Sequence, residues 1–204
     1  MPYTDFTLES VEAKFALATA LGDLFGDLPA APVPAWLGEQ LDRGRAVAAL
    51  VSEKARSEFL VAPILLACRG LVGGELAIYS GQRLDIDASQ GLTGECDYIL
   101  ALTDPVPRLR APLVTVLGAK RGDIELGLGQ CVAQLLGARL FNERAGFAGG
   151  VLYGVVTTGE AWQFLRLAGP AVTLHATRLY VDNLGAILAA FRGILTPPRE
   201  VQHP

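Results

Sequence analysis

The fold of this chain is decided by one short stretch, Leu113-Val-Thr-Val-Leu-Gly118-Ala119-Lys120. Up to the lysine its residues are almost all apolar or small, which is typical of a central strand buried on both faces of a sheet. A helix is predicted over residues 123–143 and a further strand over residues 151–157. A strand, a helix and a strand in this order indicate a right-handed crossover between two parallel strands.

The segments on either side of this unit complete a mixed α/β pattern. Short runs rich in Ile, Leu and Tyr predict further strands over residues 75–79, 83–87, 95–102, 161–167 and 172–180. Apolar residues at helical spacing predict helices over residues 8–25, 52–68 and 182–195, with a short one around Trp36 and Leu41. We expect one mixed sheet with helices on both faces, preceded by an N-terminal helical extension (1–51) and followed by a tail (197–204).

Capping residues, a glycine and a proline shape the first long helices. Thr7 and Ser52 are natural N-caps, and Glu53 follows in the first turn, near the positive end of the helix dipole. Gly26 is expected to end the first helix. Pro63 lies well inside the helix predicted over residues 52–68, where it should kink the helix or divide it in two.

The composition limits the class of protein. The chain has 204 residues, of which 51% are hydrophobic, so it suits one large domain with a sizeable core. A net charge of -4 argues against a broad basic surface of the kind that binds nucleic acid non-specifically. A local phosphate-binding patch stays open, although scattered solvated side chains are the simpler interpretation of the candidates Arg108, Arg110, Lys120, Arg121, Arg139 and Arg144.

The sequence also predicts a location and an assembly state. No basic start precedes an apolar run, so no signal peptide is expected, and the most apolar stretch, residues 59–68, is too short to span a bilayer. Cys68, Cys96 and Cys131 form no metal or disulfide pattern and are predicted to be buried thiols. We therefore expect a cytoplasmic protein without membrane contact. A mean hydropathy of +0.36 is compatible with apolar surface hidden in a homodimer.

Polar side chains are expected to converge at one end of the predicted sheet. Glu95 and Asp97 lie two residues apart in a strand and so point to the same face. Lys120 ends the neighbouring apolar strand, while Gln130 and Gln134 lie one turn apart on the following helix. A pair of carboxylates can hold a divalent metal, and a lysine beside them can position or deprotonate water. The alternative is that Asp97 and Lys120 are only the solvated ends of their strands.

These residues and their order resemble the core of the PD-(D/E)XK nuclease superfamily, as found in the nuclease parts of type I restriction subunits. That core implies a restriction endonuclease-like mixed sheet with elements in the order αβββαβ. The resemblance spans roughly residues 52–180. It is carried by Asp97, by the strand ending in Gly118-Ala119-Lys120 and by the helix with Gln130, and also by Ser52-Glu53-Lys54-Ala55-Arg56-Ser57-Glu58 upstream and residues 152–162 downstream.

The resemblance implies a catalytic role for four residues. Asp97 would be a ligand of Mg²⁺ or Mn²⁺, and Lys120 would position or activate the attacking water. Glu53, or less favourably Glu58, would be the acidic residue of the leading helix. Gln130 would line the site from the helix that follows the motif. The substrate implied is the phosphodiester of a nucleic acid.

One departure from the family pattern puts catalysis in doubt. The position two before the lysine, normally Asp or Glu, is Gly118, which offers no carboxylate. Glu95 is the best substitute metal ligand because it shares a face with Asp97, and Asp123 and Glu125 on the following helix are weaker candidates. We expect hydrolysis to be weakened or lost. The alternatives are a non-catalytic binding or assembly module on the same fold, and a small-molecule enzyme based on His175.

Overall fold

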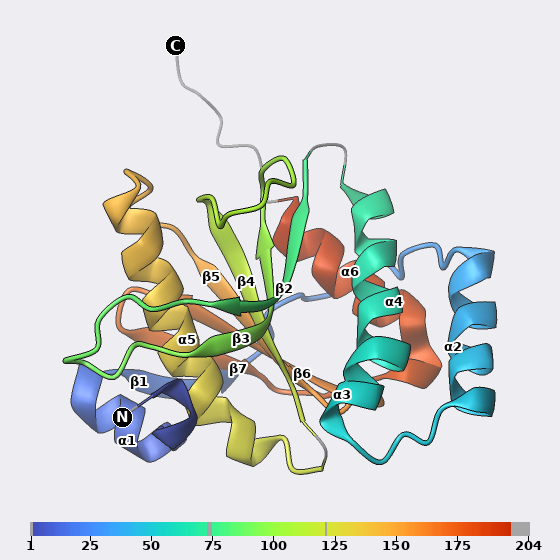
Figure 1. Cartoon of the computed structure of the whole chain (residues 1–204), viewed down its shortest axis with the longest axis horizontal. Helices are drawn as coiled ribbons and strands as arrows, with labels where there is room; N and C mark the ends of the chain where they lie inside the picture. The colour runs from blue at the N-terminus through green and yellow to red at the C-terminus, as the bar shows by residue number, and fades with distance from the viewer. Residues whose placement is uncertain (1, 73–74, 121, 197–204) are drawn as a thin grey trace.

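A computed structural model describes residues 2–72, 75–120 and 122–196 and shows a mixed α/β fold in which the described strands form one eight-stranded sheet (Figure 1). The strands run in the order β1-β7-β6-β5-β4-β3-β2, and β8 pairs with β6. Their bounds are β1 Ala18–Gly22, β2 Ala77–Arg83, β3 Glu95–Ala101, β4 Leu113–Ala119, β5 Leu152–Thr157, β6 Ala161–Ala168, β7 Ala171–His175 and β8 Leu179–Tyr180.

The centre of the sheet has the connection that the sequence predicts. β2, β3 and β4 are successive antiparallel neighbours. β4 and β5 are parallel, with Gly118 opposite Val156 and Ala119 opposite Thr157. The helix α5 (Glu125–Arg144) joins these two strands and packs on both of them. The predicted crossover between residues 113 and 157 is therefore confirmed.

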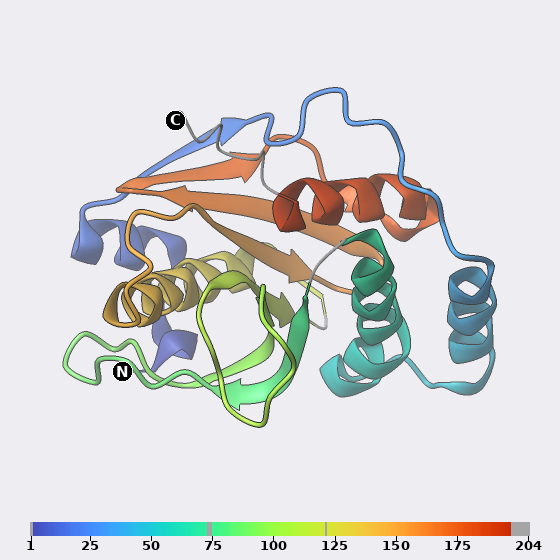
Figure 2. The ribbon, with the colours of Figure 1, turned by 90° about the horizontal axis from the view of Figure 1, so that it is seen from above.

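Helices cover both faces of the sheet, as Figure 2 shows from above. α1 (Leu8–Phe15) and α5 lie on one face, while α2 (Ala35–Val47), α3 (Glu53–Arg56), α4 (Ala62–Cys68) and α6 (Leu184–Leu195) lie on the other. Each face has its own cluster of buried apolar side chains. Among the described helices, none combines the length and the apolarity needed to cross a bilayer.

The predicted burial of the cysteines is confirmed, and two large aromatic side chains of β6 are buried as well. The three cysteines are buried and unpaired. Trp162 and Phe164 of β6 are fully buried and pack edge-to-face against Phe191 of α6, at ring-centroid distances of 6.0 and 5.4 Å. Such contacts are those of a core rather than of a surface that stacks on nucleobases.

The helix around Pro63 is continuous but irregular. α3 passes through a π-helical turn at Ser57–Val61 into α4, so that the Ala62 N–H donates to the Ser57 carbonyl. Pro63 lies in the first turn of α4, where its missing N–H costs least. We call this continuous unit, residues 53–68, the leading helix. The sequence predicts a kink or a division at Pro63; the structure shows instead a continuous helix whose regular hydrogen bonding is interrupted by the π-helical turn just before Pro63.

The helix predicted over residues 8–25 is wrong in its second half. α1 ends at Phe15 because Ala16 adopts the left-handed conformation, with φ 51°. Residues 18–22 then form β1, which pairs in parallel with β7. The helical spacing of apolar residues continues from α1 through residues 18–22. There, backbone hydrogen bonding to β7 outweighs that spacing. The segment 1–51 is therefore not purely helical and supplies an edge strand to the sheet.

Two strand predictions also need correction. Residues 83–87 are not a separate strand, because β2 ends at Arg83 and Asp87 forms only an isolated bridge with Leu92. Asp85 and Asp87 accept backbone N–H groups of the following turn, which compete with strand pairing. The strand predicted over residues 172–180 is divided into β7 and β8. The predicted tail, residues 197–204, lies outside the described residues.

Candidate functional site

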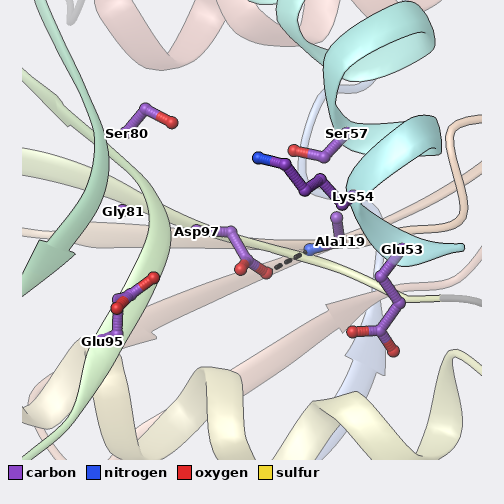
Figure 3. A pocket seen from close by; sticks show the side chains of 8 residues that line it. All are labelled: Glu53, Lys54, Ser57, Ser80, Gly81, Glu95, Asp97 and Ala119. Atoms are coloured by element: carbon purple, nitrogen blue, oxygen red, sulfur yellow. Dashed lines mark hydrogen bonds between the residues drawn. The ribbon is translucent and has the colours of Figure 1, made fainter.

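A polar pocket of about 350 Å³ lies between the start of the leading helix and the strands β2, β3 and β4. Three carboxylates line it, those of Glu53, Glu95 and Asp97. Figure 3 shows Asp97 in the middle, with Glu95 of β3 on one side and Glu53 of α3 on the other. Lys54, Ser57 and Ser80 complete its polar walls. The structure thus brings together three of the acidic residues singled out from the sequence.

Asp97 is the half-buried centre of this pocket. Its Oδ2 accepts a hydrogen bond of 2.7 Å from the Ala119 N–H. Burial raises the pKa of Asp97; the Ala119 hydrogen bond and the Lys120 charge oppose the rise, and the charges of Glu53 and Glu95 add to it. The Ala119 hydrogen bond and the Lys120 charge therefore do not fully offset the cost of burying an ionised Asp97 near Glu53 and Glu95. A bound dication would reduce the repulsion among these carboxylates.

Gly118 lies directly beside Asp97 across the β3–β4 pair. The register places Tyr98 opposite Leu117, which makes Asp97 and Gly118 cross-strand neighbours. A Cβ at Gly118 would lie 3.9 Å from Asp97 Oδ2 and 4.0 Å from Lys120 Cε. Both are ordinary van der Waals distances, so a side chain fits at this position. It would project between the carboxylate and the lysine.

Lys120 is held by α5 rather than by the pocket. Its Nζ donates a 2.9 Å hydrogen bond to Gln130 Oε1, and its backbone N–H donates to the Thr157 carbonyl at 2.7 Å. Its stem lies over Gly127, where a Cβ would come within 3.0 Å of Lys120 Cε. The expected approach of Lys120 and Gln130 is therefore present. Gly127 provides the room for it.

The other predicted polar residues lie further from the pocket. Glu58 is one turn after Glu53 and pairs with Lys54 at 2.8 Å. Gln134 donates through Nε2 to the Glu95 backbone carbonyl at 3.1 Å, so it supports the strand that carries Glu95. Glu125, at the start of α5, pairs with Arg178 and does not line the pocket.

His175 has a structural environment. Its Nδ1 accepts a 3.2 Å hydrogen bond from the Leu24 N–H, and its ring packs against Phe25 with a centroid distance of 5.0 Å. It ends β7, three strands away from β4. Asp23 Oδ1 lies 3.7 Å from Nδ1, and the pocket of about 100 Å³ that His175 lines has otherwise apolar or small lining residues. The enzyme based on His175 stays a prediction.

Sequence reasoning missed a group of hydroxyls at the rim of the pocket. Tyr98 Oη lies 2.8 Å from Ser57 Oγ and donates to the Ser57 carbonyl at 3.1 Å, which ties β3 to the leading helix. Ser80 of β2 lines the same rim. The alternation of β3 only shows that Tyr98 points away from the face of Asp97. Which residue Tyr98 hydrogen-bonds to depends on where the leading helix docks on the sheet, and strand alternation does not determine that.

The donors in this pocket fit a hard cation only in part. Carboxylate oxygens are the ligands that Mg²⁺ and Mn²⁺ prefer, and Mg²⁺ is often held by one or two carboxylates plus substrate oxygens. Within the described ranges, no group of three or more His, Cys, Asp or Glu side chains is placed to hold a metal ion. Asp97, Glu95 and Glu53 line the pocket, and the role of Asp97 and Glu95 as metal ligands stays a prediction.

Comparison with protein-family models and with curated protein sequences finds no match to this chain. The class that the structure itself defines is a mixed α/β protein with a carboxylate-lined pocket at the β3–β4 pair.

The raised pKa of Asp97 leads to a prediction about stability and pH. The folded state binds the Asp97 proton more tightly than the unfolded chain, so the ionised form destabilises the fold at pH above that pKa. The cost disappears as pH falls through the raised pKa towards the ordinary aspartate value. Asp97→Asn, whose amide oxygen can still accept from Ala119, is expected to raise Tm at neutral pH. Thermal denaturation across pH should show the gain shrinking in acid.

Asp87→Asn is the matched control, because its turn hydrogen bonds lower the pKa of Asp87. The same substitution should therefore lower Tm at neutral pH. Equal shifts of the same sign in both variants would contradict the assignment of the Asp97 penalty to burial.

Proposed function

We propose that this chain is a nuclease-like domain of the PD-(D/E)XK type, acting on nucleic acid with Mg²⁺ or Mn²⁺, whose hydrolytic activity is weakened by Gly118. The element order supports the proposal. The leading helix is followed by the antiparallel strands β2, β3 and β4, then by α5, then by β5 parallel to β4. This order supports, as part of the proposal, the αβββαβ core that the resemblance implies.

The observation that carries the proposal is the triangle of Asp97, position 118 and Lys120. The motif of the family needs an acid on one strand, an acid at the end of the next, and a lysine two residues later. In this chain the three positions are spatial neighbours, and a Cβ at position 118 would lie about equally far from Asp97 Oδ2 and Lys120 Cε. Compared with the family motif, this chain lacks the second carboxylate, because position 118 is a glycine.

The roles of the residues follow from this arrangement. Asp97, with Glu95 on the same strand, would hold the metal, which when bound would polarise a phosphodiester and acidify a water. Lys120, fixed by Gln130, would orient the attacking water beside position 118. Glu53 would approach from the leading helix. Because a site of one or two carboxylates binds Mg²⁺ weakly, we expect slow hydrolysis.

Calorimetric titration with Mn²⁺ tests this proposal directly. We expect weak binding to the wild type, no binding to Asp97→Ala, and binding about tenfold tighter or more in Gly118→Glu, which restores the missing ligand. Gly118→Gln is the matched control, because it has the same size without the charge. Binding in Gly118→Glu no tighter than in Gly118→Gln would overturn the proposal.

A non-catalytic binding module is the second candidate function. It is favoured by the Ala119 N–H, which already occupies Asp97 Oδ2, so that the carboxylate has a structural partner without a metal. It predicts no Mn²⁺ binding by the wild type, with binding gained in Gly118→Glu. In that case the fold would retain the geometry of the site but not its chemistry.

A further inference from the structure

A second pocket, mainly apolar, lies next to the carboxylate pocket. Its volume is about 340 Å³, within the usual range for small-ligand sites. Ala62, Leu65 and Leu66 of α4 and Ile78 of β2 form its apolar walls. The Leu66 side chain is 61% exposed, although it is one of the large apolar residues of α4. The core does not explain why an exposed leucine lies here.

The two pockets adjoin at Ser80 of β2, which lines both of them. Tyr98, which lines the apolar pocket, is hydrogen-bonded to Ser57, which lines the carboxylate pocket. A ligand that extends past Ser80 would reach Asp97 with one group and Leu66 with another.

The polar groups at the edge of the apolar pocket are acceptors and hydroxyls. Glu58 lines it, and its Oε1 pairs with Lys54 at 2.8 Å, which offsets its charge. A carboxylate of this kind can accept from the exocyclic amino group of a base such as cytosine. A nucleobase has apolar faces and a polar edge, which matches apolar walls with a carboxylate and a hydroxyl at the rim.

We infer that the pocket formed by Ala62, Leu65, Leu66, Ile78 and Tyr98 binds one unpaired nucleobase of the strand whose phosphate occupies the carboxylate pocket. The inference rests on the proposed function and specifies its substrate. A base inside a duplex is stacked on both faces and cannot enter such a pocket without being flipped out. The substrate class is therefore a single-stranded or locally unpaired nucleic acid, with preference for a base that carries an amino group.

Fluorescence anisotropy of the full chain with Mn²⁺ tests this inference. The probes are a short labelled oligo(dC), the same deoxyribose-phosphate chain without bases, and oligo(dT). Base contacts are expected to make oligo(dC) bind about tenfold or more tighter than the abasic chain, with oligo(dT) between them. Leu66→Ala should weaken oligo(dC) binding about fivefold and leave abasic binding unchanged.

Leu21→Ala is the matched control, since Leu21 is 72% exposed on β1, at the opposite edge of the sheet from β2. It should leave every affinity unchanged. Abasic binding as tight as that of oligo(dC), or no binding of either, overturns the inference. An unchanged oligo(dC) affinity in Leu66→Ala also overturns it. The proposed function is decided separately, by the Mn²⁺ titration of Gly118→Glu, which uses no nucleic acid.

Discussion

Gly118→Glu is expected to raise the Mn²⁺-dependent rate of phosphodiester cleavage by about 100-fold or more over the wild type. The new carboxylate would project between Asp97 and Lys120, where its Cβ has ordinary contacts and the backbone needs no left-handed conformation. A firmly held metal stabilises the transition state by several kcal/mol, and a 100-fold gain requires about 3 kcal/mol. Cleavage of a labelled oligonucleotide, with single strand and duplex compared, measures the effect.

Two further variants separate catalysis from a change in binding. Gly118→Gln should stay at the rate of the wild type, because it cannot supply a charged ligand. In the Gly118→Glu background, Lys120→Ala should lose about 100-fold, which is the lower range for a group that assists proton transfer. If Gly118→Glu binds Mn²⁺ tightly but cleaves no faster, Lys120 is not positioned for the reaction, and the non-catalytic module becomes the better description.

Without metal, Gly118→Glu should be less stable than the wild type. It adds a carboxylate beside Asp97, where the charges of Glu53 and Glu95 already raise the pKa of Asp97. Mn²⁺ should then raise its Tm in proportion to occupancy, since a ligand that binds only the folded state stabilises it.

The centre of the fold could be predicted from the sequence because local and tertiary preferences agree there. β4 matches its predicted bounds of 113–119, and α5 and β5 differ from prediction by one or two residues at their ends. The helix predicted over residues 8–25 is wrong in its second half because local and tertiary preferences disagree there. The apolar spacing of these residues suits a helix throughout, but the turn at Ala16 and the pairing of β1 with β7 depend on a strand more than 150 residues away.

The candidate site could be predicted only where strand alternation determines it. Glu95 and Asp97 on one strand and Lys120 at the end of the next were expected together, and the structure places them around one pair of strands. The approach of Glu53 to Asp97 came only from the family resemblance. The contact of Ser57 with Tyr98 could not be foreseen, because it depends on the docking of the leading helix and on the π-helical turn that begins at Ser57.

Gly129→Ala is expected to destabilise the protein by about 3 kcal/mol, at the upper end for an overpacked core position. The backbone of residues 6–8 crosses α5 at Gly129. A Cβ there would overlap the Thr7 carbonyl carbon and lie 2.5 Å from both Leu8 N and Phe6 O. Backbone atoms cannot move aside as a flexible side chain can. The N-terminal segment must therefore lift off α5 and expose Phe6 and its neighbours.

This variant decides whether the N-terminal segment belongs to the core. Tyr3, Phe6 and Val11 are each at most 3% exposed, and Tyr3 Oη donates to the Leu84 carbonyl at 2.8 Å. For a domain of this size the expected loss is a fall in Tm of roughly 10 °C. Gly38→Ala is the control, because Gly38 has open space and lies within α2, so the change should stabilise by about 0.5–1 kcal/mol. A loss below about 1 kcal/mol in Gly129→Ala would mean that the segment is a detachable extension, as a boundary at residue 51 predicts. A large loss of stability in Gly129→Ala would mean that the N-terminal segment supports α5. Gln130, the residue after Gly129, lies on that helix and accepts the hydrogen bond from Lys120.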